Sequence, residues 1–167
     1  MMQPVETIAP SRSAQVSLRE ITRESVRTIL LLKVAPEQEN FVAPNATSIA
    51  EAYFDRDYAW FRAIYADETP VGFLMLYDDP AQPLYYLWRF MVDARYQGLG
   101  FGYRALSLLI EHVRQRPNAS KLSLSYVPEA GNASPFYAKL GFVETGIEHD
   151  GELEMELNLN GTRQPAA

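Results

Sequence analysis

Three glycines occupy every second position, 98, 100 and 102, directly before the amphipathic segment YRALSLLIEHVR (103–114). Glycine costs a helix interior about 1 kcal/mol relative to alanine, so glycines where a helix begins need a physical reason. Helix N-termini carry unpaired N–H groups and the positive end of the dipole, and both attract phosphate oxygens. Glycine also allows close approach and positive φ. The pattern predicts either a pyrophosphate cradle or a tight strand–helix turn without a ligand.

Two common phosphate-binding motifs do not fit this stretch. A dinucleotide fold requires G-x-G-x-x-G near the start of its domain and an acidic residue about 20 positions later. Here the spacing is G-x-G-x-G past the middle of the chain, and the next strand offers Lys121 instead of an acid. A P-loop requires a Gly-Lys pair, which the sequence lacks. The cradle, if it is one, therefore suits a different carrier of a pyrophosphate.

The elements around the glycines follow from periodicity and turn signals. A helix is expected from Thr22 to before Pro36 with Ile29, Leu30 and Leu32 on its apolar face, and another begins at Thr47 or Ser48. Further helices are expected after the glycines and over 132–141; strands are expected over 15–20, 60–67, 71–78, 83–93 and 121–127 and on both sides of Asp150-Gly151.

The strand, glycine loop, helix and strand in mid-chain form a βαβ crossover, which requires a parallel strand pair. The remaining neighbours are expected to form antiparallel hairpins. The predicted fold is a single α/β domain: a mixed, mostly antiparallel twisted sheet with a central parallel crossover and helices on both faces. We expect the domain to span 14–160, with flexible termini at 1–13 and 161–167.

Composition narrows the function. A chain of 167 residues with net charge −6 and no dense basic run does not favour nucleic-acid binding. No apolar run approaches the roughly 20 residues that span a bilayer, and no signal peptide is evident, so we expect a cytoplasmic protein without a membrane partner. Cysteine is absent, and His112 and His149 lack metal-ligand spacing, so no metal site is expected.

At the strand–helix junction, Gln97-x-x-Gly100-x-Gly102 resembles the Q/R-x-x-G-x-G/A signature of the Gcn5-related N-acetyltransferase (GNAT) family. The order of elements over roughly residues 15–158 is also similar to that family's. Three more pieces carry the resemblance: Phe90-Met91-Val92, Asn132 with Ser134-Pro135-Phe136-Tyr137, and Leu140-Gly141-Phe142. Segments such as LLKVAPEQENFVAPNATSIAEAY (31–53) further resemble bacterial spermidine/spermine acetyltransferases.

The resemblance implies acetyl-CoA as cosubstrate and assigns residues to it. Backbone N–H groups of Gly98, Leu99, Gly100 and Gly102 would bind the pyrophosphate. The other residues implied near the cofactor are Phe90, Met91 and Val92 along the pantetheine arm, Gln97, Tyr103 and Arg95 near the phosphates, and Asn132 at the groove. Tyr137 would be the general acid that protonates the departing thiolate, a role that a phenol with a pKa near 10 can fill. From its residue type alone, Tyr137 would be interpreted as a core aromatic, and it is the family position that favours the catalytic role.

The general base stays open. A polyamine nitrogen is protonated at pH 7, so it must lose a proton before it attacks. Some polyamine acetyltransferases are thought to use a Glu on the fourth strand, but Trp88 and Arg89 stand there in this sequence. Glu37, Glu39 and Glu51 are the candidate acids for binding the cationic substrate, with Asp55 and Asp57 behind them. Taken singly, each of them is better explained as a solvated surface charge, and it is their concentration in one segment that favours a site for a long cation.

The sequence thus predicts an acetyl-CoA-dependent N-acetyltransferase that acts on a small amine, most simply a polyamine, by direct transfer in a ternary complex. Another acceptor stays open: a protein N-terminus, an amino acid or an aminoglycoside. A non-catalytic acyl-CoA sensor is the alternative from a different class, and Tyr137 argues against it. By analogy with the family, the chain could form a homodimer through its C-terminal strands.

Overall fold

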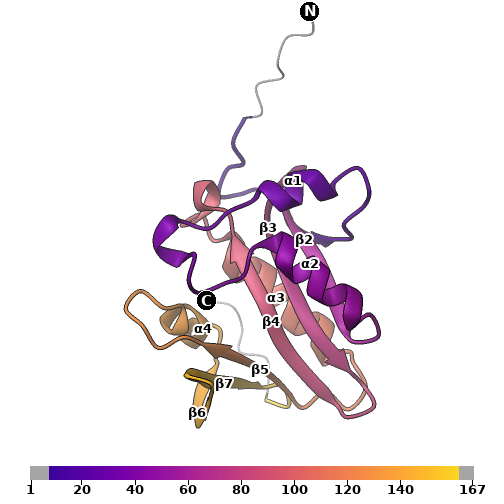
Figure 1. The fold of residues 1–167 in the computed structure, drawn as a ribbon, viewed down its shortest axis with the longest axis vertical. Coiled ribbons are helices and arrows are strands. Elements are labelled where there is room, and N and C mark those ends of the chain that lie inside the picture. The colour runs from indigo at the N-terminus through magenta and orange to yellow at the C-terminus, as the bar shows by residue number, and fades with distance from the viewer. Residues whose placement is uncertain (1–7, 162–167) are drawn as a thin grey trace, which may run out of the picture.

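The computed structural model describes residues 8–161, so residues 1–7 and 162–167 of the expected flexible ends lie outside the described part. Its strands form a single seven-stranded sheet in the order β1-β2-β3-β4-β5-β7-β6 (Figure 1). Their bounds are β1 Val16–Arg19, β2 Ala59–Ala66, β3 Thr69–Asp79, β4 Leu84–Val92, β5 Lys121–Tyr126, β6 Val143–His149 and β7 Glu152–Asn158. Within residues 8–161, only β4 and β5 pair in parallel; the other neighbouring strands are antiparallel.

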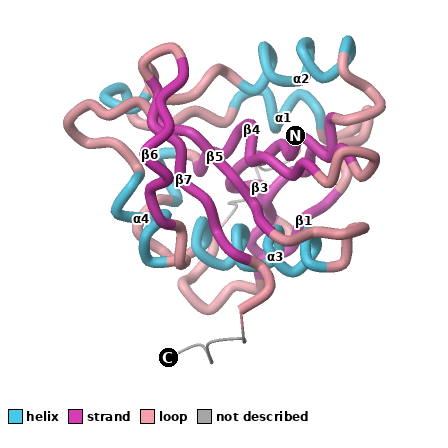
Figure 2. Tube along the Cα trace, turned by 90° about the horizontal axis from the view of Figure 1, so that it is seen from below, coloured by secondary structure: helices cyan, strands magenta, loops and turns pink. Residues whose placement is uncertain are grey.

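Helices cover both faces of the sheet, as the fold prediction requires. Figure 2 shows α1 and α2 on one side and α3 and α4 on the other. The helices are α1 Val26–Leu31, α2 Asn45–Phe54, α3 Phe101–Arg114 and α4 Ser134–Lys139, with short 3₁₀ turns η1 Pro36–Gln38 and η2 Ala94–Tyr96. The predicted mixed α/β fold with a central βαβ crossover is therefore confirmed.

Strand alternation produces one hydrophobic core on each face. On the α3 side, Leu74 and Leu76 of β3 pack with Leu106 and Leu109 of α3. On the α1–α2 side, Phe73 and Met75 of the same strand pack with Ile29, Leu32 and Ala52. The β3 strand is thus apolar on both faces, which explains its continuous run of hydrophobic residues.

Strand β4 has one extra residue between two positions that pair with consecutive residues of β3. Met75 pairs with Arg89 and the next residue, Leu76, pairs with Leu87, so Trp88 has no partner in this ladder and forms a β-bulge. The pairing of β4 with β5 ends at Leu87↔Leu124. A bulge bends and twists the strand that carries it, so β4 diverges from β5 immediately beyond Trp88. We call this divergence the strand split.

The structure corrects three details of the predicted helices. Helix α1 begins at Val26 with Ser25 as N-cap, and not at Thr22. Helix α2 begins at Asn45 with Pro44 as N-cap, and not at a Thr47 or Ser48 cap. The side chain of Asn45 is buried and donates a hydrogen bond to the Ile29 carbonyl oxygen at 2.9 Å, a tertiary contact that local propensity does not reveal. Leu30 is exposed, whereas Ile29 and Leu32 are buried as expected. The predicted hairpin turn is confirmed, because Asp150 and Gly151 both have positive φ, at 50° and 83°.

Candidate active site

A cavity of about 680 Å³ occupies the strand split. One wall is the end of β4, continuing through the glycine loop to the first turn of α3; the opposite wall is the end of β5 with the start of α4. The loop between α1 and α2 contributes Gln38, Phe41 and Val42 from one face of the sheet, and α4 contributes Phe136 and Tyr137 from the other. Since its lining comes from both faces, the cavity connects the two sides of the sheet at the split.

Most residues that the sequence assigned to acetyl-CoA line this cavity. They are Phe90, Met91, Val92, Gln97, Gly98, Gly100, Gly102, Tyr103 and Asn132, together with the proposed acid Tyr137. Leu99 is not among the lining residues, and its side chain packs against the core on the α3 side. The Asn132 side chain shapes its own loop, because it donates to the Glu129 carbonyl oxygen at 2.8 Å and accepts from the Ser134 N–H at 2.9 Å.

The three glycines serve two different structural needs. Gly98 and Gly100 have φ of +76° and +82°, in the left-handed region, and Gly100 is the N-cap of α3. A Cβ atom on Gly102 would lie 3.1 Å from Phe90 Cζ and 3.3 Å from Val92 Cγ2, so this glycine lets α3 lie close to β4. Together they turn the chain sharply and place the first N–H groups of α3 at the cavity.

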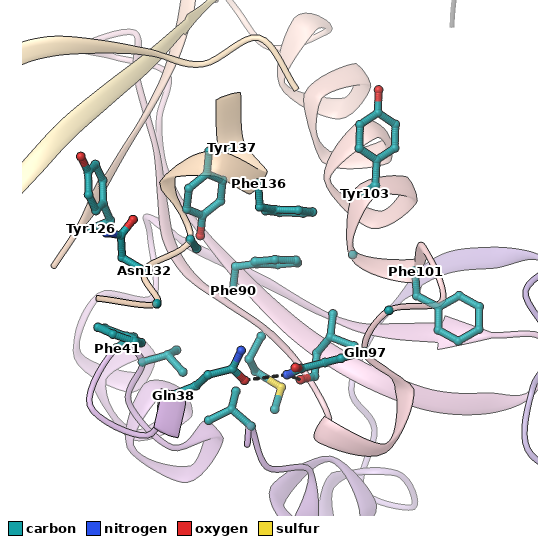
Figure 3. A pocket seen from close by; sticks show the side chains of 18 of the residues that line it. Gln38, Phe41, Phe90, Gln97, Phe101, Tyr103, Tyr126, Asn132, Phe136 and Tyr137 are labelled. Atoms are coloured by element: carbon teal, nitrogen blue, oxygen red, sulfur yellow. Dashed lines mark hydrogen bonds between the residues drawn. The ribbon is translucent and has the colours of Figure 1, made fainter. Parts of the chain in front are cut away.

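Hydrogen bonds fix the loop that carries the glycines. Asp93 is buried at the end of β4 and accepts from the Lys33 N–H and the Arg95 N–H, both at 3.0 Å. Its carboxylate also pairs with the Arg95 guanidinium at 2.8 Å. Burial acts to raise the pKa of Asp93, but these hydrogen bonds outweigh it and the pKa is lowered. The Gln97 amide donates to the Val92 carbonyl oxygen at 2.9 Å and to the Gln38 side chain at 2.7 Å, which ties η1 to the glycine loop (Figure 3).

Tyr137 reaches the cavity from α4. Its ring packs edge-on against Phe136 and Phe142, and Phe136 in turn stacks on Phe90 across the split, with ring centroids 5.7 Å apart. Figure 3 shows the phenol end of Tyr137 directed into the cavity beside Phe90 and Asn132. Burial raises the pKa of Tyr137 well above its ordinary value, with a smaller contribution from Tyr86. The hydroxyl therefore stays protonated near neutral pH and can act as a proton donor.

The predicted acceptor-side acids lie outside the lining of the cavity. Glu37 and Glu39 are exposed on either side of the lining residue Gln38. Glu51 on α2 forms an ion pair with Arg89 of β4 at 2.8 Å. Glu51 is thus the ionic partner of a half-buried guanidinium. Among the residues that the structure describes, the buried Nε atom of the same guanidinium has no hydrogen-bond partner.

Several lining residues were not predicted from the sequence. They are Arg12, Val34, Gln38, Phe41, Val42, Tyr96, Phe101, Ser125, Tyr126, Val127, Gly131, Ala133, Phe136 and Lys139. Arg12 and Lys139 add positive charge to the wall, which suits a phosphate ligand. Phe136 belongs to the Ser134-Pro135-Phe136-Tyr137 motif and could have been identified; Arg12 precedes β1 in a segment with no sequence signal.

Among residues 8–161 no group of three or more His, Cys, Asp or Glu side chains is arranged to hold a metal ion. In the same range, no helix has the length and apolar character needed to cross a membrane. The arrangement offers helix N–H groups, a half-paired strand and a neutral phenol around one elongated cavity. Such a site can bind a phosphate-bearing, extended ligand and donate a proton at its centre.

Comparison with known proteins identifies the family. The family model described as "Acetyltransferase (GNAT) family" matches residues 23–142. The chain is 26% identical over 149 residues to the spermine/spermidine N(1)-acetyltransferase of Bacillus subtilis strain 168, covering 84% of this chain and 96% of that protein. It is 32% identical over 105 residues to L-2,4-diaminobutyric acid acetyltransferase of Streptomyces avermitilis, covering 61% of this chain and 56% of that protein.

A solved structure shares the fold. Spermidine N-acetyltransferase from Vibrio cholerae, determined in complex with CoA and spermine, superposes with a TM-score of 0.69 at 16% identity, covering 87% of this chain and 96% of that one. The family match extends from before α1 to the end of α4 and so includes the glycine loop, the strand split and Tyr137. The chain belongs to the GNAT family of acetyltransferases, and it is an N-acetyltransferase.

Proposed function

We propose that the cavity binds acetyl-CoA and that the chain transfers its acetyl group to a primary amine of a polyamine, such as spermidine or spermine, by direct transfer in a ternary complex. The observation that carries this proposal is the convergence of three features on one cavity. These are the left-handed glycines before α3, the strand split and the buried phenol of Tyr137. A glycine turn, a bulged strand or a buried phenol alone is compatible with a purely structural role, but their convergence suits a phosphate-bearing thioester.

The residues present fit acetyl-CoA. The first N–H groups of α3 face the cavity where a pyrophosphate would lie, and Arg12 and Lys139 supply positive charge. Beyond Leu87, β4 is not paired with β5 in the described part of the chain, so its backbone groups can pair with the amides of a pantetheine arm as with an added strand. Bound acetyl-CoA supplies an activated acetyl thioester.

The protein's contribution to the transfer is positioning and proton donation. The backbone of β4 at the split can donate to the thioester carbonyl and stabilise the charge that develops on its oxygen. Tyr137, which burial keeps neutral, donates its proton to the departing thiolate. The walls of the cavity hold amine and thioester together, which replaces a bimolecular encounter by an intramolecular one.

A polyamine acceptor is supported by the relative that acts on spermine and spermidine and by the net charge of −6, which favours a cationic substrate. Glu37, Glu39 and Glu51 remain the acids that the sequence proposes for binding it. Replacing each of them by Gln tests this assignment, because the loss of an acid that binds the amine raises the KM for the amine. Glu51 also pairs with Arg89, so its replacement is expected to lower stability as well.

A second acceptor class has its own support. The relative from Streptomyces avermitilis is named for L-2,4-diaminobutyric acid, which carries a carboxylate beside its amines. A diamino acid would need a cationic partner for that carboxylate, and a polyamine would not. The comparison between the two classes therefore belongs in the first assay.

The direct test is release of free thiol from acetyl-CoA, followed with a thiol-reactive dye across a panel of amines. The panel contains spermidine, spermine, a diamino acid, an aminoglycoside and a peptide with a free N-terminus. Release that depends on a polyamine supports the proposal. Release with only another member of the panel rejects the polyamine assignment and identifies the acceptor class.

A further inference from the structure

Polar side chains form a row across three strands at the closed end of the split. Tyr86 of β4 pairs with Ser123 of β5, one position before the ladder ends. Ser125 lies two residues further along β5 and therefore on the same face as Ser123. Ser125 is paired across the next ladder with Glu154 of β7. The row Tyr86–Ser125–Glu154 thus lies on the face opposite α3.

This row adjoins the cavity. Ser125 is a lining residue, and the side chains of Tyr86, Ser125 and Glu154 are half-buried. Directly opposite residues of an antiparallel pair have Cβ atoms about 4.5–5.5 Å apart, so the Ser125 hydroxyl and the Glu154 carboxylate are within reach of each other, directly or through one water. Burial raises the pKa of Tyr86, and hydrogen bonding with Ser125 partly offsets the rise.

Three other carboxylates near the cavity are already engaged. Glu51 pairs with Arg89, and Asp93 holds the Arg95 guanidinium and two backbone N–H groups. Glu144 accepts a hydrogen bond from the Tyr126 hydroxyl on the opposite face of β5. Glu154, by contrast, stands across from a hydroxyl that lines the cavity, and it is in none of the ion pairs found within residues 8–161.

We propose that Ser125 and Glu154 form the route by which the attacking ammonium loses its proton. Ser125 contacts the amine and passes the proton to the Glu154 carboxylate, while Tyr86 is a positioning residue that orients the Ser125 hydroxyl. The proposal rests on the proposed function in one respect, that the acceptor is an amine protonated at neutral pH. Strand β7 lies beyond residues 23–142, so this route uses a part of the chain that the family match does not cover.

The proton and electron balance closes without a further reactant. The ammonium gives one proton through Ser125 to Glu154, and the neutral nitrogen forms a bond to the acetyl carbon. The carbon–sulfur bond breaks, and the thiolate takes the proton of the Tyr137 phenol. The second proton of the attacking nitrogen restores Tyr137, and Glu154 releases its proton to solvent. The products are an amide, a free thiol and one proton.

Charged and titratable groups face Glu154 from each neighbouring strand. They are Tyr86 and Arg89 on β4, Lys121 on β5, His149 on β6, and Glu152 and Glu156 on β7; Glu144 and Glu148 of β6 are paired with Met155 and Leu153 and lie on the other face. Lys121 is paired with Glu156 at 2.9 Å. Glu152 lies two residues from Glu154 on the same face of β7, and this like charge would favour proton uptake by Glu154.

The test is the Glu154→Gln variant, compared with the unaltered protein across pH, with whichever amine of the panel supports the fastest thiol release. At pH 7 we expect kcat/KM for the amine to fall roughly 100-fold, the lower range for loss of a general base. The variant must use the free amine from solution, so its kcat/KM should rise about tenfold per pH unit for an amine with a pKa near 10. With an amine of pKa near 6, the kcat/KM of the variant should nearly equal that of the unaltered protein, because the amine is already neutral at pH 7. Ser125→Ala should reproduce this pattern, and Glu148→Gln, an exposed acid of the same hairpin, should behave like the unaltered protein.

A deficit of the same size at every pH and with both kinds of amine would overturn the proposal, because a merely structural defect does not depend on the protonation of the substrate. Calorimetric binding of acetyl-CoA and cooperative unfolding check that each variant is folded; if Glu154→Gln does not fold, Ser125→Ala decides. A failure of the proposed function is seen separately, since polyamines would then be inactive with the unaltered protein while another amine is used.

Discussion

Arg104 of α3 donates hydrogen bonds to the carbonyl oxygens of Arg12, at 2.8 Å, and Ala14, at 2.7 Å. The same guanidinium also donates to the carbonyl oxygens of Leu99 and Gly100, at 3.3 and 3.2 Å. One side chain thus fastens the segment before β1 to the start of α3. Because of this attachment, Arg12 lines the cavity beside the glycine loop.

We expect Arg12→Ala to weaken acetyl-CoA binding by about tenfold, which is the loss of one charge-assisted phosphate contact worth roughly 1.5 kcal/mol. The measurement is calorimetric titration with CoA at low and high salt, where the difference from the unaltered protein should shrink as salt rises. Arg27→Ala, an exposed site on α1, is the matched control. Equal affinity of the Arg12 variant and its control at low salt would remove Arg12 from the phosphate site.

The two roles of the glycines can be separated. In Gly98→Ala the added Cβ atom has no described atom within 4 Å, but the residue must keep a φ of +76°. The variant should therefore lose about 1–2 kcal/mol of stability through backbone strain. Gly102→Val should displace Phe90 and Val92, whose atoms lie 3.1 and 3.3 Å from a Cβ at that position, and should abolish acetyl-CoA binding while unfolding stays cooperative. Urea unfolding and calorimetry check both. Unchanged affinity in Gly102→Val would contradict the cradle.

Tyr137→Phe should lower kcat by roughly 100-fold while acetyl-CoA still binds, as expected when a general acid is removed. Burial raises the pKa of Tyr137, so in the unaltered protein its hydroxyl stays protonated through the neutral and mildly alkaline range. We therefore predict that the pH profile of kcat shows no loss attributable to Tyr137 below about pH 10. Thiol release measured from pH 6 to pH 10 checks this; a descending limb present in the unaltered protein and absent in the variant would contradict it.

Asp93→Asn should destabilise the fold by about 2 kcal/mol, since a buried carboxylate with charge-assisted hydrogen bonds loses its charge. The pKa of Asp93 is lowered in the folded state, so its contribution is complete above the unfolded pKa and is lost as pH falls through the folded value. Urea unfolding at pH 7 and pH 3 should show a smaller pH dependence in the variant. Identical pH dependence in both proteins would show that Asp93 does not supply this stability.

Much of the fold was accessible from local signals. The apolar runs of β2 and β3, the Asp150-Gly151 turn and the amphipathic α3 each follow from composition, turn chemistry or periodicity, and the structure has all three. The predicted start of α2 was wrong because the observed start depends on the buried Asn45 and its hydrogen bond to the Ile29 carbonyl oxygen. Such a contact joins two helices and leaves no mark on local propensity.

The candidate site was accessible in part for the same reason. The glycines and Tyr137 stand in local motifs, and the structure places them around one cavity. Arg12 reaches the cavity only through Arg104, and Glu154 meets Ser125 only through the register of β5 with β7. Long-range pairings of this kind are decided by the whole fold, so no window of sequence contains them.

The bulge at Trp88 also sets the parity of strand β4. The side chains of Trp88 and Arg89 point to the same face of the sheet. The alternation of side chains between the two faces, followed from Leu84, is therefore reversed for every residue after the bulge. This reversal puts Phe90 and Val92 beneath Gly102 and leaves Met91 facing Asn45. If Trp88 were instead accommodated by regular pairing without a bulge, the register would slip by one residue and every side chain beyond it would change sides. A single supernumerary residue both opens the sheet and decides which side chains line the opening.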